Sequence, residues 1–189
     1  MVTSREAILQ ACRHIVAEEG IGALNIRSVA SQCHIALGTL YHYYADKDAL
    51  MLATVESIWK GIFHTGRPAQ PGCSFPDYIA EMYERIRAGA QAYPGFLAAH
   101  SVCVAGKRRD EAKSMMERTF QHMKAVMLGV LQGDPSVSAA IFSASFTREN
   151  LIDLVLDQLL VLLVQGQADC NILLEVIRRV IYAEKCSAP

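Results

Sequence analysis

The chain has 189 residues, of which 52% are hydrophobic and 20% charged, and its formal net charge is −1. This length fits one large domain or a small domain joined to a larger one, and the apolar content is enough for a sizeable core. The charge excludes binding of nucleic acid through a broad basic surface, because residues 1–63 carry five Lys or Arg against six Asp or Glu.

The cysteines indicate a reduced protein without a zinc site. None of the six forms a C-x-x-C pair or a close cluster with histidine, which disulfide-rich secreted domains and zinc sites require. The first residues run into a helical pattern without the features of a signal peptide, and the longest apolar run, Leu159 to Val164, is too short to span a membrane. We therefore expect a cytoplasmic protein with no membrane contact, no metal and no cofactor.

The N-terminal third of the sequence predicts four helices separated by short breaks. The first begins after a cap at Thr3 or Ser4 and ends at a pair of glycines. Asn25 is placed to cap a second helix, a third covers about 36–43, and Asp46 is placed to cap a fourth. Apolar residues recur at intervals of three and four in the first two helices, as expected for helices with one buried face.

The rest of the sequence also predicts helices, after a loop at 65–73 that contains Gly and Pro. In chain order they cover about residues 74–92, 109–132, 134–146, 147–164 and from 169 onward, and a short segment over 96–104 follows the first of them. No segment alternates apolar and polar residues with the period of a strand. The predicted fold class is all-α, with about nine or ten helices.

Residues 24–47 contain the most informative pattern in the chain. Two short amphipathic helices fit this segment, with a tight turn near Cys33 and His34. The second helix is only about two turns long, too short to be stable alone, yet it carries several aromatic and hydroxyl side chains. Such a helix suits docking into a groove better than filling a core, and the arrangement is that of a helix-turn-helix, whose second helix enters the DNA major groove.

This segment resembles the TetR family of bacterial transcriptional regulators. The residues that carry the resemblance are Ile26, Arg27, Val29 and Ala30, then 38–44 (Gly-Thr-Leu-Tyr-His-Tyr-Tyr), then Asp46, Lys47 and Leu50. It covers about residues 3–52 and implies a three-helix DNA-binding domain over 1–47 and a connecting helix over about 47–64. Residues 65–189 then form a larger helical domain that binds an effector and dimerises.

The resemblance and the side-chain chemistry together assign DNA contacts to a small set of residues. Helix N-termini favour phosphate at Asn25 and Lys47, and Gly38 allows close approach of the backbone. Thr39 and His42 offer polar atoms to phosphates or base edges. The full predicted set is Asn25, Arg27, Leu37, Gly38, Thr39, Tyr41, His42, Tyr43 and Lys47.

Three residues depart from the family pattern. His34 stands where a turn glycine is frequent, so we expect a positive φ there. Ala36 replaces a common hydroxyl residue, and Leu37 replaces a polar or charged one, so we expect Leu37 to contact a thymine methyl group or no base.

Several of these residues also fit roles that involve no DNA. Leu40 and Tyr44 lie on the face that we expect to be core. Arg27 fits a solvated charge as well as a DNA contact, and Lys47 fits an ordinary first-turn lysine, although a cation there opposes the helix dipole unless an anion is near.

The larger helical part carries two predicted surfaces. In the resemblance, the last two long helices form the dimer interface, and the helix over 147–164 is apolar nearly all round, which requires burial on more than one face. A monomer core is the alternative. The predicted interface residues are Leu151, Leu154, Val155, Leu159, Leu162, Ile172, Val176, Ile177 and Val180. The predicted effector contacts are Phe96, His100, Cys103, Met116, Phe120 and Met123, which also fit a plain core.

The leading hypothesis is a homodimeric regulator that binds a double-stranded DNA operator and is a repressor released by a small, mostly apolar effector. The alternative keeps DNA binding without a small-molecule effector, so that the helical part binds a protein partner or only dimerises. A redox sensor through Cys33 or Cys103 is disfavoured because nothing nearby lowers a thiol pKa. An enzyme is not expected, because the sequence has no Gly-rich phosphate loop, metal-ligand spacing or nucleophile elbow.

Overall fold

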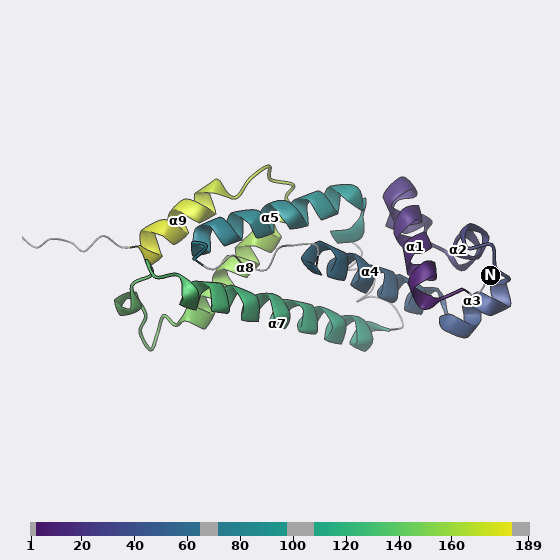
Figure 1. Ribbon diagram of the computed structural model, residues 1–189, viewed down its shortest axis with the longest axis horizontal. Helices are drawn as coiled ribbons and strands as arrows, with labels where there is room; N and C mark the ends of the chain where they lie inside the picture. The colour runs from purple at the N-terminus through teal and green to yellow at the C-terminus, as the bar shows by residue number, and fades with distance from the viewer. Residues whose placement is uncertain (1–2, 65–71, 98–107, 183–189) are drawn as a thin grey trace, which may run out of the picture. The chain divides into compact units, whose positions relative to one another are not determined.

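The computed structural model describes residues 3–64, 72–97 and 108–182, and these residues confirm the all-α class (Figure 1). They form eight α-helices and two 3-10 helices, with no strand among them. In chain order the elements are α1 (Arg5–Glu19), η1 (Ile21–Ala23), α2 (Ile26–Gln32), α3 (Leu37–Tyr43), α4 (Lys47–His64), α5 (Phe75–Ala92), α7 (Arg109–Gly133), η2 (Ala139–Ile141), α8 (Arg148–Val164) and α9 (Asn171–Ile181). Most of the loop predicted at 65–73 and of the short segment at 96–104 lies outside the described residues.

The chain packs as two units. The N-terminal unit comprises residues 1–65 and 88–118, and the C-terminal unit comprises residues 66–87 and 119–189. Helices α5 and α7 each contribute one end to each unit. Compact packing is a different criterion from function, so the division into DNA-binding and effector-binding domains stays a prediction.

The N-terminal unit is built around α1, which begins and ends where the sequence predicts. The Ser4 hydroxyl accepts the Ala7 N–H at 3.1 Å, and Gly20 ends the helix with a φ of 82°, its N–H donating to the Val16 carbonyl. Ile8, Cys12 and Val16, spaced by four residues, are fully buried on one face of α1. The apolar faces of α2 to α4 complete this core.

A second part of the N-terminal unit holds the chain after α5. The Ile21 N–H donates to the Pro94 carbonyl at 3.0 Å, and Gly95 adopts a φ of 78° at a position where a Cβ would lie 2.9 Å from the Ile21 side chain. The Phe96 ring packs edge-on against Trp59 of α4, with ring centroids 4.7 Å apart.

The C-terminal unit contains a buried carboxylate that joins three segments. Asp134 accepts a hydrogen bond from the Phe75 N–H at 2.8 Å, one from the Ser136 N–H at 3.0 Å and one from the Tyr182 hydroxyl. Burial and the Asp134 carboxylate raise the pKa of Tyr182. The carboxylate therefore fixes the start of α5, the turn after α7 and the end of α9 to one another.

One predicted helix is wrong. The sequence predicts a helix over 134–146, but only the 3-10 turn η2 forms there. The Ser138 N–H donates to the Ile181 carbonyl at 3.3 Å, and the Ser143 hydroxyl accepts the Phe146 N–H at 3.1 Å. Bonds of the backbone to another segment and to a nearby side chain compete with helix formation, and residues 134–146 contain both kinds.

Candidate nucleic-acid interface

Helix α2 begins at a capping box formed by Asn25. The Asn25 side-chain oxygen accepts the N–H groups of Arg27 at 3.0 Å and Ser28 at 2.9 Å, and the Ser28 hydroxyl accepts the Asn25 N–H at 3.3 Å. Ile26, the first residue of α2, is buried, whereas Arg27, the second residue, is exposed. The cap therefore fixes a helix start with an exposed cation in its first turn.

The turn between α2 and α3 contains the backbone conformation that the sequence predicts. His34 has a φ of 53° and is, within the described ranges, the non-glycine residue with a positive φ. Its N–H donates to the Ser31 carbonyl, and the Ile35 N–H then reaches back to the Ala30 carbonyl at 3.0 Å. This left-handed residue turns the chain sharply enough for α3 to start at Leu37.

Helix α3 has one buried face and one exposed face. Leu40 and, just after the helix, Tyr44 are fully buried, as expected from their spacing. Leu37 is 44% exposed and Tyr41 53% exposed, and Gly38, Thr39 and His42 are also exposed. Large apolar and aromatic side chains left in water on a two-turn helix indicate a surface that contacts another molecule.

Tyr43 differs from its neighbours because its hydroxyl already has a partner. The hydroxyl donates to the Thr3 carbonyl at 2.5 Å, and the side chain is half-buried. A phosphate oxygen only accepts hydrogen bonds, so Tyr43 must release Thr3 before its hydroxyl can donate to a phosphate.

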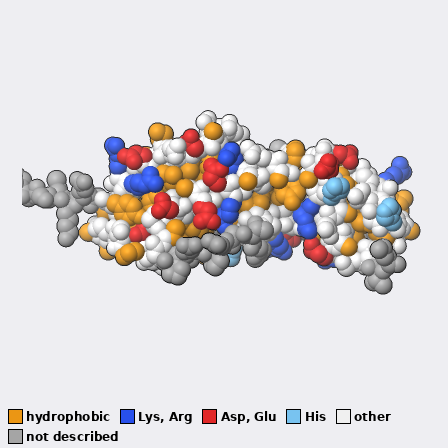
Figure 2. All heavy atoms as spheres, turned by 45° about the horizontal axis from the view of Figure 1, so that its top comes forward, with side chains coloured by type: hydrophobic (Ala, Val, Ile, Leu, Met, Phe, Trp, Pro, Cys, Tyr) orange, Lys and Arg blue, Asp and Glu red, His pale blue; other side chains and the backbone are white. Residues whose placement is uncertain are grey.

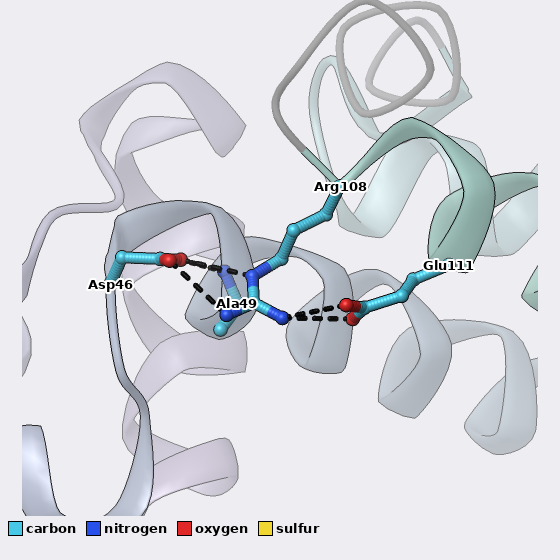
Figure 3. Close-up of polar contacts among 4 residues, drawn as sticks. All are labelled: Asp46, Ala49, Arg108 and Glu111. Atoms are coloured by element: carbon cyan, nitrogen blue, oxygen red, sulfur yellow. Dashed lines mark hydrogen bonds and ion pairs between the residues drawn. The ribbon is translucent and has the colours of Figure 1, made fainter.

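Helix α4 starts beside an ion-pair cluster. The Oδ1 atom of Asp46 accepts the Ala49 N–H at 2.7 Å, which caps the helix. Arg108 donates from Nε to Oδ1 at 3.2 Å and from Nη2 to Oδ2 at 3.1 Å, and its Nη1 donates to both carboxylate oxygens of Glu111 at 2.8 and 2.9 Å (Figure 3). We call Asp46, Arg108 and Glu111 the Arg108 cluster. The hydrogen bonds that Arg108 donates lower the pKa of the Asp46 carboxyl, so Asp46 and Arg108 are both charged at neutral pH.

The structure exposes most of the predicted DNA contacts. Of the nine residues, all except the half-buried Tyr43 are exposed, and they come from the starts of α2 and α4 and from α3. On the face shown in Figure 2, acidic and basic side chains are interspersed, and the described residues form no extended basic area there. Sequence reasoning missed Arg108, because it follows Asp46 by 62 residues and lies in an ordinary charged helix start.

The predicted effector contacts fall in different parts of the structure. Phe96 and Met116 are buried in the N-terminal unit, whereas Met123 is buried and Phe120 half-buried in the C-terminal unit. His100 and Cys103 lie outside the described residues. The effector site therefore stays a prediction.

The predicted dimer residues divide by exposure. Leu154, Ile172 and Val176 are exposed by 61%, 81% and 50%, and Leu162 and Val180 are half-buried. An open groove of about 400 Å³ runs between α8 and α9, lined by Leu154, Leu162, Ile172 and Val176 among others. These residues leave an apolar surface uncovered in the single chain.

The other predicted dimer residues belong to the core of the chain. Leu151, Val155, Leu159 and Ile177 are each at most 3% exposed, so they pack within the C-terminal unit and leave little surface for a partner. Sequence reasoning left out Val164 of α8, which is 77% exposed.

The described residues contain neither a membrane-spanning helix nor a group of metal ligands. No described helix is both long and apolar enough to cross a membrane. Across residues 3–64, 72–97 and 108–182, no three His, Cys, Asp or Glu side chains are grouped so that they could hold a metal ion.

A left-handed turn followed by a short helix with an exposed outer face, on an all-α scaffold, defines a helix-turn-helix protein. Residues 8–54 match the family model described as bacterial regulatory proteins, tetR family. The family that the sequence predicts is thus matched over residues 8–54, which run from α1 into α4.

Curated relatives share part of their length with this chain. It is 32% identical over 78 residues to the HTH-type transcriptional regulator UidR of Escherichia coli strain K12. The match covers 41% of this chain and 40% of UidR, so the chain matches less than half the length of this relative.

Solved structures share the fold over nearly the whole chain. The multidrug binding protein EbrR complexed with imidazole superposes with a TM-score of 0.66 at 18% identity and covers 100% of both chains. A putative transcriptional regulator from Rhodococcus sp. RHA1 gives 0.69 at 14% identity over 96% of both chains. BioQ with its natural double-stranded DNA operator gives 0.58 at 16% identity over 97% of this chain and 100% of BioQ.

The cap of α2 gives the first prediction. Aspartate caps a helix as well as asparagine does, so Asn25→Asp is expected to lose only the hydrogen bond that the Asn25 Nδ2 donates to the Ala23 carbonyl at 3.0 Å and to stay more stable than Asn25→Ala, which costs about 1 kcal/mol of stability. If Asn25 faces a phosphate, the added negative charge of Asn25→Asp lowers DNA affinity without unfolding the protein. Thermal melts together with fluorescence-anisotropy DNA titrations measure both effects, and an Asn25→Asp protein that binds DNA like wild type contradicts this position for Asn25.

Proposed function

We propose that this chain is a homodimeric, DNA-binding transcriptional repressor that a small, mostly apolar effector releases from its operator. The observation that carries the proposal is the exposed face of α3, with Leu37, Thr39 and His42 in water beside the start of α4. A helix of this length fits the major groove, and helix N-termini supply the phosphate contacts that hold it there.

DNA binding by this unit depends on a few contacts. Arg27 and Lys47 are exposed cations in the first turns of α2 and α4, where the positive end of the helix dipole also attracts phosphate. In the groove, Leu37 offers a methyl contact, and Thr39 and His42 offer hydrogen bonds. Two cations in each subunit attract the DNA phosphates only weakly, so both subunits of a dimer must bind the DNA together for useful affinity.

Two of the similar proteins support DNA binding by this chain. UidR is described as an HTH-type transcriptional regulator, and BioQ has been solved with a double-stranded DNA operator. The BioQ likeness extends over 97% of this chain. At 16% identity, it supports a shared fold and leaves the operator sequence of this chain open.

DNA binding is tested with fragments of the promoter region of the chain's own gene. The dimer is expected to bind one fragment, with log K falling against log[salt] at a slope of about −4, since four cations contact phosphates. Lys47→Ala is expected to make that slope shallower by about two in the dimer. Lys60→Ala is the matched control, because Lys60 is an exposed lysine farther along α4 that pairs with Glu56 at 2.9 Å.

Fluorescence anisotropy over a salt series measures these slopes. A wild-type protein that binds no fragment at low salt contradicts the proposed function. Equal slopes for wild type and Lys47→Ala contradict the phosphate contact of Lys47.

Dimerisation is supported by the apolar surface that α8 and α9 leave uncovered. Ile172 and Val176, one turn apart on α9, and Leu154 on α8 face the open groove between these helices. Exposed apolar side chains grouped along one groove are typical of a surface that binds another protein or a ligand. A second copy of the chain covers it with the same residues, as a two-fold interface requires.

The double variant Ile172→Glu with Val176→Glu is expected to be a folded monomer, because four carboxylates cannot be buried in a two-fold interface. Sedimentation equilibrium should give the 20.8 kDa mass of one chain for the variant and twice that mass for wild type. Loss of DNA binding is expected with it. Val126→Glu is the control, because Val126 is an exposed apolar residue of α7 outside this groove. A wild-type monomer, or a dimeric double variant, contradicts the proposed interface.

An apolar effector is supported by the predicted effector contacts that the structure describes. Phe96 is buried against Trp59, and Met116 is a buried, flexible side chain of the kind that adapts to varied apolar ligands. EbrR, which has this fold, has been solved with proflavin. The alternative without a small-molecule effector keeps the same DNA contacts and dimer.

Trp59 is the only tryptophan of the chain, so its fluorescence reports binding near Phe96. We expect saturable quenching by proflavin or by a member of a panel of apolar compounds, and release of operator DNA at the same ligand concentrations. Phe96→Leu is expected to weaken the quenching. Phe142→Leu is the matched control, because Phe142 lies in the loop before α8, and it is expected to leave the quenching unchanged. Normal operator binding with no saturable quenching by any compound favours the alternative without an effector.

A further inference from the structure

Arg108 is held between two carboxylates at the start of α4. Two of its nitrogens contact Asp46 at 3.1 and 3.2 Å, and a third contacts Glu111 at 2.8 and 2.9 Å (Figure 3). Within the described residues, this bidentate pair joins the segment before α4 to the segment before α7. Such fork-shaped contacts are the strongest that arginine makes with carboxylates.

The acidic partner stands at an unfavourable place for DNA binding. Asp46 immediately precedes Lys47, whose side chain and helix N-terminus form the predicted phosphate contact. A carboxylate there repels a phosphate, and Asp48 adds a second acidic group in the same turn. Without compensation, the acidic groups outnumber the cation at this helix start.

We propose that Arg108 supports DNA binding through its charge: it compensates the negative charge of Asp46 so that the N-terminus of α4 can hold a phosphate. This role rests on the proposed function. Arg108 lies outside residues 8–54, which the family model matches, and its hydrogen bonds go to Asp46 and Glu111, neither of which is a predicted DNA contact.

The geometry separates this role from helix capping. Asp46 caps α4 through its own bond to the Ala49 N–H at 2.7 Å, which needs no arginine. The side chains of Arg108 and Asp46 are 26% and 48% exposed, so the pair contributes little to stability by burial. An open cleft of about 630 Å³ is lined by Arg108 and Glu111 together with residues of α3 and α4, so the cluster is open to solvent.

Substitutions at the two partners distinguish charge from position. The substitution Asp46→Asn keeps the cap of α4, because asparagine is as good a cap as aspartate. Arg108→Gln leaves the charge of Asp46 uncompensated, so it is expected to weaken operator binding about tenfold at about 50 mM salt. Asp46→Asn removes that charge, so it is expected to bind at least as tightly as wild type. In the double variant, removal of both charges is expected to restore affinity to within about threefold of wild type.

Two further variants test whether the effect is specific to the pair of Arg108 and Asp46. Glu111→Gln removes the other partner and is expected to leave affinity unchanged or higher, because the local charge becomes more positive. Arg87→Gln is the matched control, since Arg87 pairs with Glu84 at 2.6 Å in a similarly spaced surface pair within α5. Circular dichroism melts establish that each variant is folded, and the defect of Arg108→Gln is expected to shrink as salt screens the charge.

The outcomes are decisive in both directions. Equal affinity of Arg108→Gln and wild type for the operator overturns the proposal. The proposal is also overturned if Asp46→Asn binds as weakly as Arg108→Gln and the double variant does not recover, because the ion pair then acts by holding α4 in place and its charge has no effect on affinity. A wild-type protein that binds no promoter fragment defeats the proposed function itself. Recovery in the double variant supports charge compensation, because a contact that only positions α4 stays broken there.

Discussion

The burial of Leu40 and Tyr44 is the constraint on which the N-terminal unit depends. Helix α3 has seven residues and is too short to persist alone in water, so these two fully buried side chains hold it in place. Arg5 of α1 lies over the Tyr44 ring, 5.1 Å from its centroid. Once this face is fixed, the helical period leaves Leu37, Tyr41 and their neighbours in water. The predicted DNA-binding surface is thus a consequence of how α3 packs.

Local chemistry made much of this unit predictable from sequence. The cap at Asn25, the positive φ at His34 and the buried face of α3 each depend on residues within a few positions of one another. The helix predicted over 134–146 does not form, because the Ser138 N–H bonds to the carbonyl of Ile181 and the Phe146 N–H bonds to the Ser143 hydroxyl. The spacing of apolar residues does not reveal that competition.

Long-range pairing was beyond sequence reasoning. Arg108 meets Asp46 across 62 residues, and Asp134 meets Tyr182 across 48. Helix α8 shows the same limit, because it is apolar nearly all round and its sequence offers no signal for which side faces the core. The structure buries Leu151 and Val155 and leaves Leu154 exposed. The proposed interface is therefore smaller than the predicted one, and it is centred on the groove between α8 and α9.

Charge is the property that the proposed function must overcome. The first 63 residues carry one more acidic than basic side chain, yet DNA is a polyanion. Helix N-termini solve part of this problem without side-chain charge, and Arg108 neutralises a carboxylate that would oppose them. The Arg108 carbonyl accepts the Ala112 N–H at 2.9 Å, so this arginine moves with the first turn of α7. Since its bonds to Asp46 are 3.1–3.2 Å long, a shift of α7 by a few ångströms relative to α4 would break them and restore the repulsion. Under the proposed function, the affinity of α4 for phosphate therefore depends on where α7 begins, even though α7 contributes no residue to the predicted DNA contacts.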